Sequence, residues 1–221
     1  MRTMVAAALI MLAGVAQAYE AGDMLFRGGV ATVAPDASSS ELALDGSAIA
    51  GSEADVDDGT AIGLTFVYMI SDKVGLEVLA STPFSHDISA DTGALGLGTV
   101  SAGETKHLPP TVSLQYFPAD PSSAFQPYVG AGVNYTLFFD EDVDGQLEGV
   151  LGSGDLDLDA SFGLALQAGF DYALNDKWLV NVGVWWVDID TDATFTFGSS
   201  QLTTDVEIDP LVYSISLGYR F

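Results

Sequence analysis

Cysteine is absent from the 221 residues of the sequence, and basic residues are scarce. Without cysteine, a disulfide framework and a thiolate metal site are both excluded. The sequence has 6 Lys and Arg against 31 Asp and Glu, and its formal net charge is -25. A surface this negative repels the phosphate backbone, so nucleic acid is excluded as a partner.

The sequence also lacks an apolar run long enough for a membrane-spanning helix, which needs about 20 residues. Residues 1–18 carry a shorter apolar run between Arg2 and Ala16-Gln17-Ala18, which predicts a secretory signal peptide. Residues 19–221 would then form one domain, an outer-membrane barrel. The sequence is 48 % hydrophobic. An exported apolar chain without an apolar helix must spread its hydrophobic residues over strands, and only a closed barrel pairs all strand backbone groups in lipid.

The sequence does contain segments in which apolar and polar or small residues alternate, most clearly the last segment, 210–221. Large apolar residues occupy every second position, so one face of a strand would be apolar and the other small or polar. A terminal Phe after such a strand resembles the assembly signal of bacterial outer-membrane barrels. We therefore expect the barrel-assembly machinery to bind this strand through Tyr213, Ile215, Leu217, Tyr219 and Phe221.

Strand-like alternation occurs in eight segments: 23–34, 60–70, 74–84, 107–118, 127–139, 160–172, 178–186 and 210–221. Their connections are alternately long and short. Four long loops and three short turns are what an all-β fold of one kind requires, an eight-stranded antiparallel transmembrane up-and-down β-barrel with both termini in the periplasm. A soluble lipocalin-like barrel is the main alternative, but it would place the apolar stripes inside.

Aromatic residues gather at the short-turn end of the predicted strands and predict an interfacial girdle there. The girdle would consist of Tyr68, Tyr116, Phe117, Phe170, Tyr172, Trp178, Tyr219 and Phe221.

Three stretches, 79–88, 107–117 and 127–136, resemble the signature stretches of the OmpW family. This resemblance implies an eight-stranded outer-membrane barrel that passes small hydrophobic molecules, as the related alkane-uptake proteins do. The expected partners are small hydrophobic solutes, outer-membrane lipid and lipopolysaccharide, and no cofactor is expected.

Four charged residues point into the predicted lumen near the short-turn end: Arg27, Glu77, Asp171 and Arg220. In a lumen barely wide enough for side chains they should pair, because an unpaired buried charge is far costlier than a pair. We interpret them as a periplasmic plug. The alternative is that they are solvated residues at the periplasmic mouth.

Higher in the predicted lumen, the inward positions become apolar. An apolar funnel above a charged plug would admit a hydrophobic solute but would give it no straight route through. The alternative is the ordinary core packing of a small filled barrel. The proposed funnel consists of Val33, Phe138, Trp185, Val187 and Ile189.

Pro83, Pro109 and Pro110 fall at about the same height on two neighbouring predicted strands. Proline cannot donate a hydrogen bond to the ladder. We interpret these residues as a weak lateral seam through which apolar solutes leave into the membrane. The alternative is that they merely end two strands.

Catalysis is not expected, because Ser85, His86 and Asp87 are adjacent on one strand and no nucleophile motif surrounds them. We interpret His86 and His107 as interfacial residues.

Two groups of acidic residues have the oxygen ligands that Ca²⁺ or Mg²⁺ prefers. The first group is Asp55, Asp57 and Asp58, and the second is Asp140, Glu141, Asp142 and Asp144. Such loops would bind cations between the protein and lipopolysaccharide; the alternative is that they are solvated negative loops. A structural or adhesive barrel without transport is the second function that the sequence leaves open.

Overall fold

The barrel is closed. The computed structural model describes residues 19–221, so the predicted signal peptide, residues 1–18, lies outside the described residues. Its eight barrel strands pair antiparallel in chain order, and β1 pairs with β17 to close the ring. The predicted eight-stranded up-and-down barrel is therefore confirmed. The strands are β1 (Met24–Ala34), β6 (Gly59–Ser71), β7 (Val74–Ser81), β10 (Thr111–Tyr116), β11 (Phe125–Val143), β13 (Ser161–Ala173), β14 (Trp178–Val187) and β17 (Leu211–Arg220).

Side chains alternate across the barrel wall as the sequence predicts. In β1, Leu25 and Arg27 are buried, whereas Met24 and Phe26 are exposed. The same exposed apolar face recurs on neighbouring strands and forms a continuous apolar band around the barrel. A soluble barrel would bury this face, so the lipocalin-like alternative is excluded. No helix within residues 19–221 is long and apolar enough to cross a membrane.

An aromatic girdle lies at the end of the barrel where the short turns are. The ring of Tyr219 contacts the rings of Trp178 and Phe221, with centroids 5.0 and 4.9 Å apart. Phe117 does not belong to this girdle as predicted. It is buried inside the barrel, against the rings of Tyr19 and Tyr128, because it follows the outward Tyr116 and so points to the opposite face.

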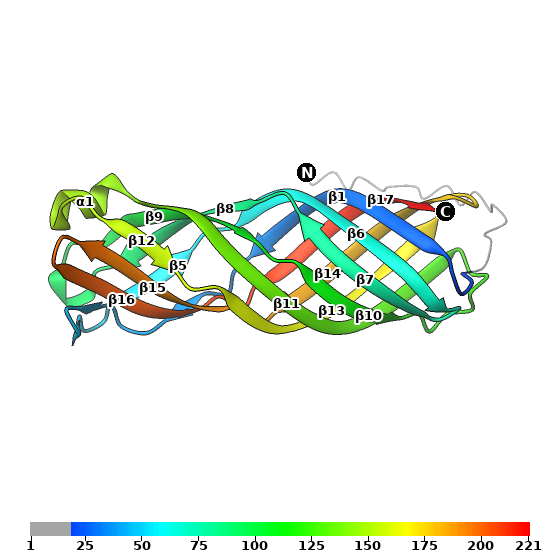
Figure 1. Ribbon diagram of the computed structural model, residues 1–221, viewed down its shortest axis with the longest axis horizontal. Helices are drawn as coiled ribbons and strands as arrows, with labels where there is room; N and C mark the ends of the chain where they lie inside the picture. Colours follow the sequence, from blue (N-terminus) through cyan, green and yellow to red (C-terminus); the bar gives the residue numbers. More distant parts are fainter. Residues whose placement is uncertain (1–18) are drawn as a thin grey trace, which may run out of the picture.

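The four long connections are folded rather than loops, and together they form what we call the cap. Figure 1 shows the cap at the end of the molecule opposite the C-terminus, with β11 running through both parts. β9 pairs with the outer half of β11 and so extends the barrel sheet into the cap. A second sheet of the cap is built around β15 and β16. The cap consists of β2 (Ser38–Ser39), β3 (Ala43–Leu44), β4 (Ser47–Ala48), β5 (Glu53–Val56), β8 (Phe84–Asp91), the 3-10 helix η1 (Gly93–Leu95), β9 (Thr99–Leu108), α1 (Gly145–Leu151), β12 (Asp155–Leu158), β15 (Asp190–Phe197) and β16 (Ser200–Glu207).

The acidic residues of the cap occupy the outer face of its strands. In β15, Asp190 and Asp192 are exposed, whereas Thr191, Ala193 and Phe195 are buried. The cap therefore has an apolar interior that is continuous with the upper lumen of the barrel.

Candidate functional site

Arg27 lies at the centre of a buried ionic network in the lower half of the barrel. Its Nη1 is 3.1 Å from Glu77 Oε2 and its Nη2 is 2.6 Å from Asp171 Oδ2. All three side chains are 1 % exposed. β1, β7 and β13 each contribute one of these residues, so the network ties together strands that are not neighbours. We keep the name plug for Arg27, Glu77 and Asp171.

Neutral polar side chains complete the hydrogen bonding of the plug. Gln115 and Gln167 each donate to Glu77, at 2.8 and 2.9 Å. Asn181 and the hydroxyl of Tyr19 donate to Asp171, at 2.9 and 2.8 Å. Carboxylates with several donors are tolerated in a low-dielectric interior, so the network closes the lumen at this height.

Arg220, which the sequence interpretation assigned to the plug, lies outside this network. Its Nη1 is 3.7 Å from Asp23 Oδ2 and its Nη2 donates to the carbonyl of Asp176 at 3.0 Å. Asp176 lies in the short turn before β14, so these two partners of Arg220 lie at the lower rim, and its guanidinium also lies 6.0 Å from the centre of the buried ring of Tyr19.

An apolar cluster fills the lumen around and below the plug. It consists of Tyr19, Leu25, Val67, Met69, Phe117, Tyr128 and Leu179. The sequence interpretation missed this second closure, although the inward phase of Leu25 and Val67 was available from the alternation.

Above the plug, the lumen contains two adjoining apolar cavities. All five predicted funnel residues line them: Phe138 lines the upper cavity, Trp185 and Val187 the lower one, and Val33 and Ile189 both. A third apolar cavity continues toward the tip of the cap and shares Ala54 and Ile88 with the upper cavity. The apolar space therefore extends from the cap to the middle of the barrel.

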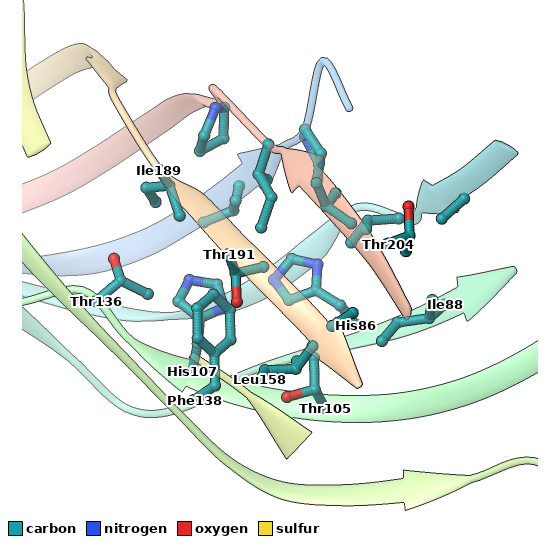
Figure 2. A pocket seen from close by; sticks show the side chains of 18 of the residues that line it. His86, Ile88, Thr105, His107, Thr136, Phe138, Leu158, Ile189, Thr191 and Thr204 are labelled. Atoms are coloured by element: carbon teal, nitrogen blue, oxygen red, sulfur yellow. The ribbon is translucent and has the colours of Figure 1, made fainter. Parts of the chain in front are cut away.

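His86 and His107 lie in the wall of the upper cavity (Figure 2) and not at an interface as expected. Their side chains come from the paired strands β8 and β9, and the residues are only 4 % and 5 % exposed. The two rings stack with centroids 4.8 Å apart, and His107 also stacks on Phe84 at 5.3 Å. His86 and His107 occupy inward-facing positions on two adjacent strands, and this alternation could have placed them in the lumen.

Both histidines are neutral near pH 7. Burial lowers the pKa of His86 below its usual value. Burial and then the nearby His86 lower the pKa of His107 to about 3. A proton on either ring would be poorly solvated in this apolar space.

The wall of the barrel is interrupted beside the lower cavity. Pairing of β7 with β10 stops at Leu79 and Thr111, and pairing of β8 with β9 begins only at Phe84 and His107. Residues 80–83 and 108–110, which we call the seam, lie between these two ladders. They include Pro83, Pro109 and Pro110, which have no N–H to donate.

The seam lies within the apolar band and borders the lumen. Thr82 N donates to the carbonyl of Ile62, and Tyr135 N donates to that of Pro110. Because Ile62 and Tyr135 are exposed residues of the band, the seam lies at lipid height. On its inner side, the lower cavity is lined by Ala80, Ser81 and Pro109.

Among residues 19–221, one group of three carboxylates has its oxygens close together, and it is neither of the two groups predicted from the sequence. Asp188, Asp190 and Asp209 have ligand oxygens within 4.8 Å of one another. Of the predicted cation-binding residues, Asp140 instead forms an exposed ion pair with Lys106, at 3.0 Å. All three residues lie between β14 and β17 in the chain. Strand pairing, and not their spacing in the sequence, brings them together.

The chain resembles known outer-membrane proteins over almost all of its length. A family model described as the OmpW family matches residues 20–221. Outer membrane protein W of Vibrio cholerae serotype O1 is 48 % identical over 92 % of this chain and 91 % of that protein. The dibenzothiophene metabolism operon protein PahQ of Pseudomonas aeruginosa is 32 % identical over 89 % of this chain and 87 % of that protein.

Among solved structures, the crystal structure of the outer membrane protein OprG from Pseudomonas aeruginosa superposes with a TM-score of 0.87. It is 46 % identical, and the match covers 93 % of this chain and 99 % of that one.

Proposed function

The chain belongs to the OmpW family of outer-membrane proteins, and we propose on that premise that it conducts small hydrophobic molecules passively into the outer membrane. In this proposal the cap lies outside the cell and both chain termini lie on the periplasmic side. A solute enters the apolar space of the cap, moves down to the level above the plug, and leaves sideways through the seam into lipid.

The observation that carries the proposal is that the apolar lumen and the seam meet. Trp185 and Val187 on one side of the lower cavity face Leu79, Ala80 and Pro109 on the other. A hydrophobic solute in this cavity is therefore separated from lipid by a stretch of wall in which the pairing of β7 with β10 has ended and that of β8 with β9 has not begun. Opening this stretch breaks fewer backbone hydrogen bonds than opening any paired stretch would.

The lower half of the barrel supports a lateral exit over a route into the periplasm. The plug and the apolar cluster below it occupy the lumen under the cavities. Driving a solute past Arg27 would separate buried ion pairs, which is strongly unfavourable.

The relatives support an apolar cargo. PahQ is named for an operon of dibenzothiophene metabolism, and dibenzothiophene is a compact aromatic molecule without a hydrogen-bond donor. A molecule of this kind matches the apolar lining of the two cavities.

Replacing the three seam prolines by alanine, as P83A/P109A/P110A, tests the exit. The new N–H groups are expected to pair across the seam and to slow uptake several-fold. The measurement is the rate at which intact cells that contain an octane oxidase convert octane, with barrel content quantified in the outer membrane.

The matched control is P118A/P121A, which changes two prolines of the short turn at the opposite end of β10. Octane conversion at the wild-type rate in the seam variant would overturn the lateral exit. Conversion that is unchanged by deleting the whole protein would overturn transport itself and favour a structural or adhesive barrel.

We also propose that the protein is not an enzyme. Along β8, His86 is buried whereas Ser85 and Asp87 are exposed, so the three side chains do not converge. Purified barrel is expected to release no product from phospholipid or peptide substrates, and turnover by the purified protein would contradict this.

A further inference from the structure

The upper cavity is apolar except for a few polar side chains, and most of those already have partners. The hydroxyl of Thr191 donates to the carbonyl of Asp159 at 2.8 Å, and that of Thr204 donates to the carbonyl of Ser40 at 2.9 Å. The hydroxyl of Thr136 donates to Asn134 Oδ1 at 2.7 Å. These threonines therefore turn their donors away from a molecule in the cavity.

The two histidines differ from the threonines in this respect. Among residues 19–221, His86 Nε2 and His107 Nε2 are buried polar atoms without a hydrogen-bond partner. A buried polar atom left unpaired destabilises the fold, so a partner supplied by a ligand is favoured. Figure 2 shows the two rings side by side among the residues that line the cavity.

The tautomer of His86 follows from its one hydrogen bond. His86 Nδ1 is 2.6 Å from the carbonyl oxygen of Asp57. A carbonyl oxygen only accepts, so Nδ1 carries the proton and donates. In the neutral ring, Nε2 is then an acceptor, and it requires a donor from the ligand.

Gly59 leaves room for the ring of His86. A Cβ at position 59 would lie 2.7 Å from His86 Nε2 and 2.5 Å from Cε1. Both distances are shorter than real Cβ contacts, so a side chain at position 59 would push against the ring of His86.

We propose that His86 and His107 form a polar subsite in the apolar lumen that binds the O–H group of a molecule with an apolar tail, an alcohol or a protonated carboxylic acid. The O–H group donates to His86 Nε2, and its oxygen accepts from His107 Nε2 in the tautomer that carries the ring proton there. The tail lies along Phe138 and Ile189 toward the seam. The inference deepens the proposed function, because it assumes that apolar molecules enter the lumen.

Direct binding tests the subsite without measuring transport. The sequence has 2 histidines, so ¹⁵N labelling of histidine in untagged barrel in lipid nanodiscs reports these rings alone. The probes are 1-octanol and methyl heptyl ether, which have the same number of heavy atoms but only one of which donates. Octanol is expected to shift the Nε2 signal of His86 and to bind about fivefold more tightly than the ether, as one net hydrogen bond allows.

One variant removes the acceptor itself. H86F retains a ring stacked on His107 but removes Nε2. In this variant, octanol and the ether are expected to bind within about twofold of each other. The control F138L changes the same cavity without removing a nitrogen and should retain the preference for octanol.

The possible outcomes separate the two proposals. Equal binding of octanol and ether by the wild-type barrel, with no shift of the Nε2 signal, would overturn the subsite and leave the proposed function intact. Absence of binding by either probe, together with unchanged octane conversion in cells without the protein, would overturn both.

Discussion

Arg27 is the cation on which the two buried carboxylates of the plug depend. Replacing it, as R27M, keeps most of the side-chain volume but leaves Glu77 and Asp171 buried without a counter-charge. The free energy of unfolding is expected to fall by about 3–5 kcal/mol. Urea unfolding in lipid vesicles, followed by tryptophan fluorescence, measures this change.

The matched control is K106M, which breaks the exposed ion pair with Asp140, whose side chains are 44 % and 61 % exposed. Its expected cost is below about 1 kcal/mol, because solvent screens an exposed pair. An R27M barrel as stable as K106M would show that the plug does not stabilise the fold.

Asp190 is a residue whose ionised carboxylate destabilises the fold. Burial, and then Asp188, Asp209 and Glu207, raise the pKa of its carboxyl. A folded-state pKa above the unfolded one means that ionisation destabilises the fold, and this cost appears as pH rises through the unfolded value, near 3.9. D190N is therefore expected to raise the denaturation temperature at pH 7 and to have no effect near pH 3.

The gain from D190N should be below about 1 kcal/mol, since the carboxyl is exposed and screened. The measurement is heat-induced unfolding by gel shift at a series of pH values. The control D157N removes an exposed acid from β12. A gain that persisted at pH 3 would contradict an electrostatic origin.

At the scale of elements, the strands and their phase could be predicted because the period of two is a local property of the sequence. The third and fourth strands were predicted to continue through Phe84 and to begin at His107, but they are interrupted at Pro83 and at Pro109. The prolines were visible in the sequence. The separation of two ladders around them depends on pairing between β7, β8, β9 and β10, which spacing alone does not fix.

A reversible disulfide across the seam gives a prediction at this scale. Ala80 follows and Pro110 precedes the last paired residues, Leu79 and Thr111, and the native chain contributes no cysteine. Oxidised A80C/P110C is expected to lower octane conversion several-fold, and a membrane-permeant reductant should restore it.

The control pair, V78C/V112C, joins residues that already face each other in the ladder, so its oxidation should leave conversion unchanged. Equal conversion by the oxidised and reduced seam pair would argue against solute exit at this position.

At the scale of the whole molecule, the cap was not predicted. Several of its strands, such as β5, β12 and β15, carry two acids at alternate positions, and from the local sequence such segments resemble solvated loops. Phe195, Leu202 and Leu156 become core residues only once the connections from different parts of the chain are brought together. The plug charges, in contrast, could be placed from phase alone, apart from Arg220 at the rim.

The formal net charge of -25 leads to a prediction about salt. Like charges on the cap repel one another, so screening is expected to raise the denaturation temperature as ionic strength increases. At equal ionic strength, NaCl and CaCl₂ should act alike if the cap acids are simply solvated. A saturable rise at low CaCl₂ concentration, absent with NaCl, would instead indicate bound calcium.

The 19 residues of β11 run from the turn end of the barrel into the cap without a break. Their outer half is paired to β9, and β12 of the second cap sheet also contacts β11. The length of β11 therefore sets how far the protein extends beyond the membrane. Each residue added to that half would carry the mouth of the cap at most about 3.3 Å further from the lipid.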